Sequence, residues 1–292
     1  MKIEKVLTGF IPEPRGLDGL TLAVMVARQS GAALSVANVL PPAWSTPGPG
    51  KADESAWRAY LTEQAEAALA QARRLAGDDA SYVVLSHKGS GRGLVELARK
   101  QDADVVVIGS APHGAKGRIS LGSTADQLLH SSSVPVMLAP RGYAEARPAE
   151  FERLTVAYRR GPGCDVAVKE AARVAASLDV PLRLVTLVVG GGRAKIEMEM
   201  QEQLRSSAAD DLKAAARGQR RKIQVDVEVL EGRTVADAMS STSWLPGELI
   251  ICASSDSGPL RRVFLGDTSI KILKAATCPV MILTRQPALG KQ

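Results

Sequence analysis

The second half of the chain repeats the first, and this repeat limits the fold more than any other feature of the sequence. Three pairs of segments match at one offset, namely Asp104–Gly109 with Glu248–Ala253, Leu121–Gly122 with Leu265–Gly266, and Val134–Leu138 with Cys278–Ile282. A chain of 292 residues is long enough for two domains of the commonest size. The duplication therefore predicts two similar domains, residues 1–141 and 149–286, joined by a short segment rich in Pro and Gly.

Short β-branched runs alternate with helical patterns in each half. This alternation predicts parallel strands, because right-handed crossovers place the helices on both faces of one sheet. The expected fold class is α/β, with two tandem doubly wound five-stranded parallel-sheet domains. The expected strands are residues 5–8, 34–39, 82–85, 105–108 and 134–138 in the first half, and 154–157, 182–189, 225–229, 249–252 and 280–283 in the second.

The pattern within a strand also predicts its place in the sheet. Residues 225–229 alternate Val with acidic side chains, which is typical of an edge strand, whereas residues 249–252 are apolar throughout and are expected in the middle. The apolar runs 134–138 and 280–283 come last in each half. Each is therefore expected to be a sheet edge that needs cover.

Composition excludes several classes of function. The net charge is +6, but the basic residues are scattered and lack neighbouring aromatic residues, so no nucleic-acid partner is expected. The three cysteines lack metal-ligand spacing and are expected to be small buried residues in a reducing compartment. No apolar run approaches the roughly 18 residues of a membrane span, and no signal-peptide pattern precedes the first strand. We therefore expect a cytoplasmic protein with no membrane partner.

One loop is placed to bind a ligand, because ligands of doubly wound sheets bind beyond the carboxyl ends of the strands. After residues 105–108 the chain runs from Gly109 to a helix that opens with Gly122-Ser123-Thr124. A glycine at the strand end lets a ligand approach the backbone, and a helix N-terminus attracts phosphate. Three side chains add positive charge around the loop: His113, Lys116 and Arg118.

This spacing resembles the universal stress protein family, whose nucleotide-binding members carry Gly-x-x-Gly-x(9)-Gly-(Ser/Thr) at this place. The pattern stands here as Gly109, Pro112, Gly122 and Ser123, and the resemblance covers both halves, as in tandem two-domain members. It implies the adenine nucleotide alpha hydrolase-like form of the fold, with ATP or AMP bound in the first domain. The binding residues expected from it are Thr8, Gly9, Val39, Gly109, Pro112, His113, Gly122, Ser123 and Thr124.

Two departures from the family's pattern predict weak binding. Pro112 replaces the second glycine and has no N–H, which removes one phosphate donor and costs about 1.5 to 3 kcal/mol. The binders also place an aspartate at the end of the first strand to hold adenine, whereas this chain reads Thr8-Gly9-Phe10 there.

The corresponding loop of the second half departs further. Ala253, Asp256 and Gly266-Asp267 stand at the motif positions. Asp267 is expected to be a helix N-cap, and its carboxylate would repel a phosphate by about 4 kcal/mol at about 4 Å and a surface-like dielectric. We therefore expect no nucleotide in the second domain.

The sequence contains no catalytic motif or metal-ligand spacing, so an enzyme is not expected. The resemblance leaves two functions open. One is a stress-response sensor that binds a nucleotide in its first domain, and the other is a ligand-free stress protein that associates with an unidentified protein partner. In the family the last strands pair between domains. We therefore expect the two domains to form an internal pseudo-dimer, and a homodimer of the whole chain remains open.

Overall fold

The structure is a computed structural model that describes residues 2–42, 51–146, 148–190, 195–221, 223–254 and 266–283. The strands in these ranges are β1 (Lys5–Gly9), β2 (Ala33–Leu40), β3 (Ser81–Ser86), β4 (Val105–Gly109), β5 (Val136–Ala139), β6 (Arg153–Ala157), β7 (Leu182–Val189), β8 (Val225–Gly232), β9 (Glu248–Ala253) and β10 (Val280–Leu283). The helices are α1 (Pro14–Ser30), α2 (Lys51–Ala76), α3 (Ser90–Gln101), α4 (Ser123–Ser131), α5 (Tyr143–Ala146), α6 (Pro162–Leu178), α7 (Lys195–Arg217), α8 (Val235–Ser240) and α9 (Asp267–Ala275).

The strands in the described ranges form one ten-stranded sheet in the order β3-β2-β1-β4-β5-β10-β9-β6-β7-β8. All strand pairs within the first half are parallel, and so are those within the second. The predicted α/β class with two doubly wound parallel units is confirmed. The alternating strand, β8, lies at an outer edge and the apolar strand, β9, lies inside, as their patterns predicted.

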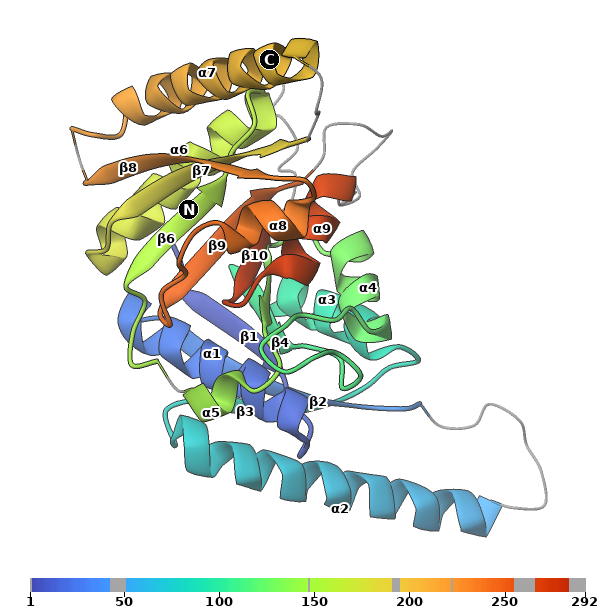
Figure 1. Cartoon of the computed structure of the whole chain (residues 1–292). Helices are drawn as coiled ribbons and strands as arrows, with labels where there is room; N and C mark the ends of the chain where they lie inside the picture. The colour runs from blue at the N-terminus through green and yellow to red at the C-terminus, as the bar shows by residue number, and fades with distance from the viewer. Residues whose placement is uncertain are drawn as a thin grey trace, which may run out of the picture.

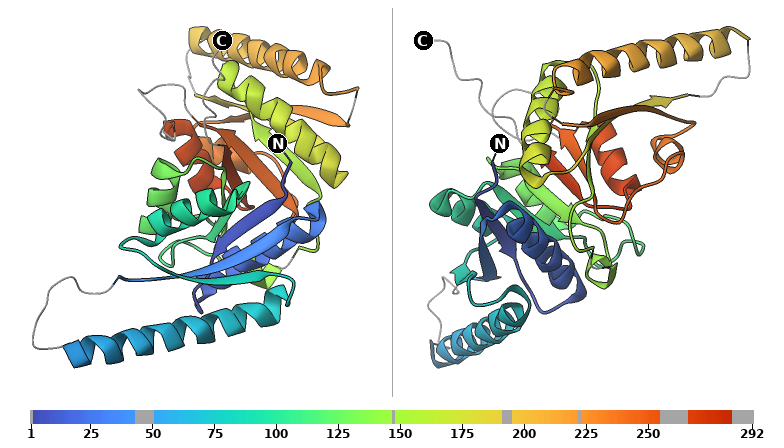
Figure 2. Two further views of the ribbon diagram at one scale, coloured as in Figure 1. Left: turned by 180° about the vertical axis from the view of Figure 1, so that it is seen from behind. Right: turned by 90° about the vertical axis from the view of Figure 1, so that its left-hand side faces the viewer.

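Helices cover both faces of the sheet (Figures 1 and 2). The buried side chains of α1, α2, α6 and α7 belong to one core cluster, and those of α3, α4, α8 and α9 belong to a second cluster on the opposite face. Figure 1 shows the two long helices, α2 and α7, at opposite ends of the molecule. Each packs on the outer strands of its own half, α2 on β2 and β3, and α7 on β7 and β8.

The last strands of the two halves pair with each other. β5 and β10 run antiparallel and join the two parallel units into the continuous sheet. Pairing removes two strand edges that would otherwise expose unbonded backbone groups. The internal pairing of the two domains is thereby confirmed. Its three opposed residue pairs, all at most 1% exposed, are Leu138 with Val280, Met137 with Met281, and Val136 with Ile282.

The segment that joins the two halves is fixed to α1 by a buried carboxylate. Asp18 is 2% exposed and accepts hydrogen bonds from the backbone N–H groups of Gly142, at 2.9 Å, and Ala144, at 2.8 Å. The two N–H groups satisfy the carboxylate, which would otherwise be costly to bury. The start of the connection is therefore a structured part of the first half.

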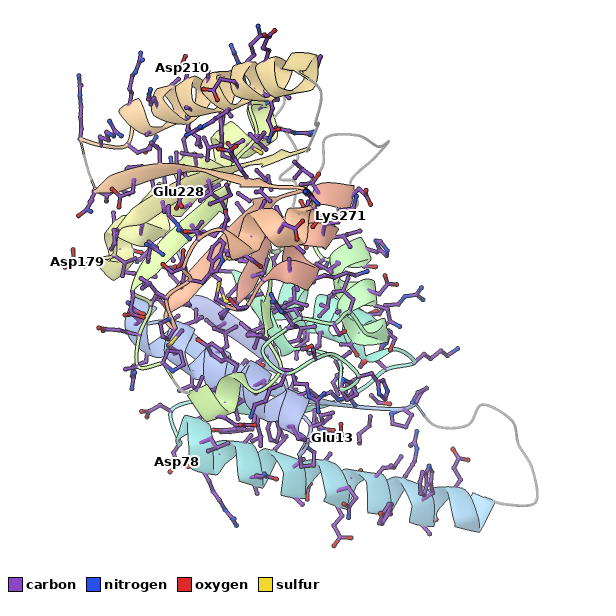
Figure 3. The ribbon with its side chains drawn as sticks, in the orientation of Figure 1. Glu13, Asp78, Asp179, Asp210, Glu228 and Lys271 are labelled. Carbon is purple, nitrogen blue, oxygen red and sulfur yellow. The ribbon has the colours of Figure 1, made fainter. Side chains whose placement is uncertain are left out.

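A buried ion network distinguishes the second half from the first. Glu248 is fully buried at the start of β9. Its carboxylate accepts hydrogen bonds from Nη2 of Arg153 at 2.7 Å, from Nη2 of Arg183 at 2.7 Å and from the hydroxyl of Thr155. Arg183 also pairs with Glu228 of β8 at 2.9 Å, a residue labelled in Figure 3. These contacts give each buried charge a partner. The equivalent position of the first half holds Asp104. Among the described residues, Asp104 accepts hydrogen bonds only from the backbone N–H groups of Glu4 and Lys5.

We predict that Leu138→Ala lowers the free energy of unfolding of the whole chain by about 2–5 kcal/mol, because it opens a cavity at the junction of the two halves. Urea denaturation measures this loss. A loss well below 1 kcal/mol would contradict a tightly packed junction.

We predict that Glu248→Gln lowers the free energy of unfolding by about 3–5 kcal/mol, because it leaves two guanidinium groups without their buried anion. The matched change Asp104→Asn removes a carboxylate at the equivalent position of the first half, where an amide oxygen still accepts the two backbone N–H groups. It should cost less in the same urea titration. Equal losses would show that the network adds nothing specific to the second half.

Candidate functional site

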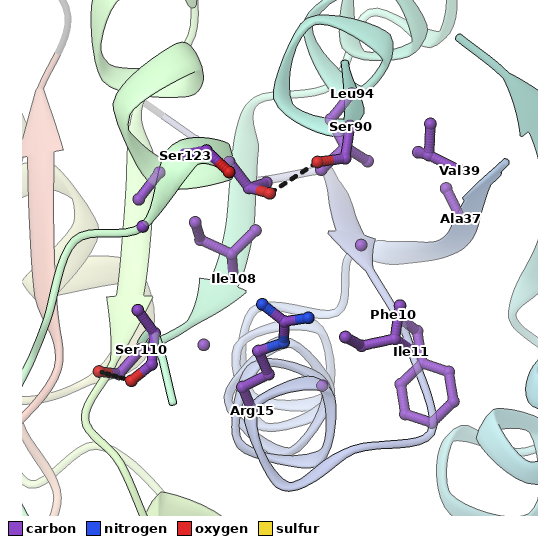
Figure 4. A pocket seen from close by; sticks show the side chains of 17 residues that line it. Phe10, Ile11, Arg15, Ala37, Val39, Ser90, Leu94, Ile108, Ser110 and Ser123 are labelled. Carbon is purple, nitrogen blue, oxygen red and sulfur yellow. Dashed lines mark hydrogen bonds between the residues drawn. The ribbon is translucent and has the colours of Figure 1, made fainter. Parts of the chain in front are cut away.

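A cavity of about 160 Å³ lies at the carboxyl ends of β1 and β4. Strand order reverses between these strands, because the chain proceeds from β1 to β2 on one side and later places β4 on the other. Such a switch point is where doubly wound sheets bind ligands. The seventeen described residues that line the cavity are Gly9, Phe10, Ile11, Arg15, Gly16, Ala37, Val39, Ser90, Leu94, Ile108, Gly109, Ser110, Ala111, Gly122, Ser123, Thr124 and Ala125 (Figure 4).

The N-termini of three helices, α1, α3 and α4, contribute residues to this lining. The first helical hydrogen bond of α4 runs from the backbone N–H of Asp126 to the carbonyl of Gly122, at 2.9 Å. The N–H groups of Ser123, Thr124 and Ala125 precede it and have no partner within the helix. Ser90 of α3 and Thr124 of α4 share a hydroxyl–hydroxyl hydrogen bond of 2.6 Å, which joins the two helix starts. This wall of the cavity is therefore suited to an anion.

Arg15 is the only charged residue among the described residues that line the cavity. It is the second residue of α1, and Figure 4 shows its guanidinium group directed into the middle of the cavity. Its Nε lies 2.9 Å from the Glu13 carboxylate in the preceding loop, where Figure 3 labels Glu13. Arg15 was not among the residues predicted from the sequence, because it belongs to no motif and lies far along the chain from the Gly109–Ser123 loop.

Close packing of α1 against the end of β4 places Arg15 there. A Cβ atom on Gly109 would lie 1.9 Å from the Arg15 carbonyl oxygen, and one on Gly19 would lie 2.7 Å from the Gly109 backbone nitrogen. The two glycines therefore let the helix touch the strand. The space that a side chain at Gly109 would need is taken by α1, and the Gly109 backbone also lines the cavity, where the expected approach of a ligand stays a prediction.

Six of the nine residues expected to bind a nucleotide line the cavity: Gly9, Val39, Gly109, Gly122, Ser123 and Thr124. The other three, Thr8, Pro112 and His113, are not among its lining residues. Thr8 is fully buried, and its hydroxyl donates to the carbonyl of Val107 at 2.9 Å, so it is not available to a base. Pro112 and His113 are exposed on the loop.

The two long cations of the loop are bound elsewhere. Lys116 pairs with Glu145 of α5 at 2.5 Å. The Arg118 guanidinium donates to the carbonyl of Ala275, at the end of α9 in the second half. Lys116 and Arg118 therefore hold the loop against its neighbours. The positive charge within the cavity comes from Arg15 of α1.

A second cavity occupies the equivalent place in the second half, beyond β6 and β9. Its lining includes Ala253 and Gly266-Asp267 from the motif positions, while Asp256 lies outside the described residues. The N-cap of α9 is Gly266, and Asp267 is its first helical residue, so the expectation that Asp267 is the cap is wrong. Asp267 pairs instead with Lys271 at 2.7 Å, and this hydrogen bond and charge lower the pKa of Asp267 (Figure 3 labels Lys271).

Other polar groups of the second cavity also have partners within the protein. Tyr158 donates its hydroxyl to Asp165 at 2.9 Å, and burial followed by this bond raises the pKa of Tyr158 to about 12. Arg160 pairs with Asp211 at 3.2 Å. The described lining of the second cavity thus includes one carboxylate, Asp267, whereas the described lining of the first includes none and its cation, Arg15, pairs with Glu13 outside the lining.

Among the described residues, no group of three or more His, Cys, Asp or Glu side chains is arranged to hold a metal ion. None of the helices in the same ranges combines the length and the apolar character of a membrane span.

The sequence model of the universal stress protein family matches the chain twice, over residues 3–140 and 150–284. A universal stress protein of Mycobacterium tuberculosis is 32% identical over 290 residues, which cover 95% of this chain and 99% of that protein. The crystal structure of a universal stress protein from Archaeoglobus fulgidus superimposes with a TM-score of 0.62 at 20% identity, covering 96% of each chain. A putative universal stress protein from Pseudomonas aeruginosa gives a TM-score of 0.61 at 13% identity, covering 96% of this chain and 93% of that one. At these identities the two structures show a shared fold.

We predict that Gly109→Ala lowers the free energy of unfolding by about 1–3 kcal/mol, because the new Cβ atom forces α1 away from β4. Thermal or urea unfolding measures the loss. Gly218→Ala is the control, since a Cβ atom there meets nothing within 4 Å. If both variants were equally stable, the close approach of α1 would not depend on Gly109.

Proposed function

The chain belongs to the universal stress protein family, and we propose that it is a cytoplasmic stress-response protein whose first domain binds ATP or AMP weakly and so acts as a sensor. The observation that carries this proposal is the first cavity. It brings the unbonded N–H groups at the start of α4 and the Arg15 guanidinium to one place, with no carboxylate among its described lining residues.

The proposed binding is weak because β1 offers no carboxylate or other free polar side chain to the base. The residue at the end of β1 is Gly9, and the preceding Thr8 is bonded within the sheet. The proposed binding residues are the six expected residues that line the cavity, together with Arg15 and Ser90. The six are Gly9, Val39, Gly109, Gly122, Ser123 and Thr124.

We propose that the second domain binds no nucleotide. A carboxylate, Asp267, stands where the first domain has the hydroxyl of Ser123, and it lies at the helix start that a phosphate would approach. We also propose binding without catalysis, because the described residues that line the two cavities include no carboxylate and histidine arranged as an acid–base pair.

A ligand-free protein that acts by association is the second candidate. Two aromatic side chains on α2 favour this candidate, Trp57 and Tyr60. They are 47% and 50% exposed, and their rings stack with the centroids 5.6 Å apart. Exposed aromatic residues of this kind are enriched at protein–protein interfaces.

We predict that a calorimetric titration of ATP with Mg²⁺ gives binding in the micromolar range near one site per chain. Ser123→Asp should weaken this binding by at least about tenfold, because it copies the carboxylate of Asp267 to the start of α4. Ser206→Asp on the exposed surface of α7 makes the same chemical change far from the cavity and should leave binding unchanged. Absence of binding to the wild-type chain would favour the association candidate.

A further inference from the structure

We propose that β3, the outer edge strand of the first half, is a docking surface for a second copy of this chain, whose own β3 pairs with it antiparallel about a two-fold axis. The sheets of the two copies then form one continuous sheet. This inference goes beyond the proposed function and holds whether or not the first cavity binds a nucleotide. It follows from the unpaired backbone of β3, from the absence of charge along the strand and from the opposite charges at its two ends.

One side of β3 has backbone groups without a neighbouring strand. β3 lies at one end of the strand order, so among the described residues only β2 pairs with it. The backbone N–H of His87, just after β3, donates to the carbonyl of Leu40 in β2 at 2.9 Å. Backbone groups of successive residues point to opposite sides of a strand, so those of Tyr82, Val84 and Ser86 point away from β2. Such a row of N–H and C=O groups is a template for another strand.

The two outer edges of the sheet differ in their protection against pairing. Edge strands commonly carry charged residues or proline, which discourage pairing with another chain. β8 follows this rule with Asp226, Glu228 and Glu231. β3 reads Ser-Tyr-Val-Val-Leu-Ser, with neither charge nor proline, and Val84 is 39% exposed. The β3 edge is therefore open to pairing, whereas two β8 strands would bring like charges together.

The charges at the two ends of β3 favour a second β3 in antiparallel direction. Asp78 and Asp79 precede the strand and Lys88 follows it (Figure 3 labels Asp78). In an antiparallel pair with Val83 on the two-fold axis, Asp78 of one copy lies opposite Lys88 of the other. Opposite charges in this position stabilise a strand pair, and a parallel pair would instead place acid beside acid. Asp78 also lies 3.5 Å from Arg73 of its own chain, but its side chain is 87% exposed and remains open to a second cation.

α2 leaves room for this pairing. It packs on both β2 and β3, and neighbouring strands of a sheet are about 4.8 Å apart. Two helices that each lie over the outer two strands of their own copy therefore come within about 10 Å of each other across the axis, which is an ordinary distance for packed helices. The flank of α2 on this side carries Arg73, whose guanidinium lies 4.7 Å from the centre of the Tyr82 ring. The two α2 helices thus extend the contact beyond the strands.

A contact between two β3 strands closes after two chains, because the same surface is used on both copies. Pairing of β3 with β8 of another copy would instead be head-to-tail and would continue into filaments. The acidic residues of β8 disfavour that contact. The assembly expected from the structure is therefore a dimer.

The test is sedimentation velocity of the full chain between about 1 and 100 μM, because a contact of this size is expected to be weak. The mass should approach twice the 30.8 kDa of one chain at the highest concentrations and stop there. A mass that stays at one chain throughout overturns the inference, and so does a mass that continues beyond two chains. Each outcome leaves the proposed nucleotide site unaffected.

The first variant tests the strand edge. Val84→Lys places a charge at the centre of β3 and should weaken dimerisation by at least about tenfold. Val166→Lys makes the same change at a 52% exposed position on α6 and should leave the dimer unchanged. Equal dimerisation of the two variants overturns the inference. A melting temperature of each variant equal to that of the wild type shows that the fold is intact.

A charge reversal tests the antiparallel direction. Lys88→Glu should weaken the dimer by about three- to tenfold, because it places acid opposite Asp78 on both sides of the axis. Lys100→Glu makes the same charge change at an exposed position on α3 and is the control. Adding Asp78→Lys to Lys88→Glu should restore the wild-type affinity, which a merely structural role of Lys88 would not do. Unchanged affinity in Lys88→Glu, or no recovery in the double variant, overturns the antiparallel pairing.

Discussion

Two apolar strand edges, one at the end of each half, determine the architecture of this protein. β5 and β10 would each expose unbonded backbone groups and apolar side chains if they remained in water. Their antiparallel pairing removes both edges and merges the cores of the two halves into one cluster on each face of the sheet. Other contacts between the halves depend on it, including the bond from the Arg118 guanidinium to the end of α9.

The cavity of the first half depends on a second close contact, between α1 and β4. Gly19 and Gly109 allow the helix and the strand to touch, and this contact brings the start of α1 beside the starts of α3 and α4. A cation from one helix thereby joins the unbonded N–H groups of another at the strand-order switch point. This grouping of a cation with helix N-termini follows from the packing of the backbone. It therefore does not depend on the loop cations Lys116 and Arg118, which bind other parts of the protein.

The arrangement of strands was predictable because periodicity and repetition are local properties of the sequence. The edge position of β8, the interior position of β9 and the pairing of the last strands all agree with the structure. The roles of individual side chains were not predictable in the same way. Thr8 turns into the sheet, Gly109 admits a helix and Arg15 enters the cavity from a helix without a motif, and each outcome depends on neighbours distant in sequence.

The covalent connection between the halves has a consequence for the concentration dependence of their pairing. Two separate subunits joined only by their last strands would dissociate on dilution, according to the law of mass action. Here the two strands belong to one chain, and the connection that begins at Gly142 is fixed to Asp18, so each half meets its partner at a constant effective concentration. The ten-stranded sheet therefore persists however scarce the protein is in the cell, and each molecule always pairs one half of each kind.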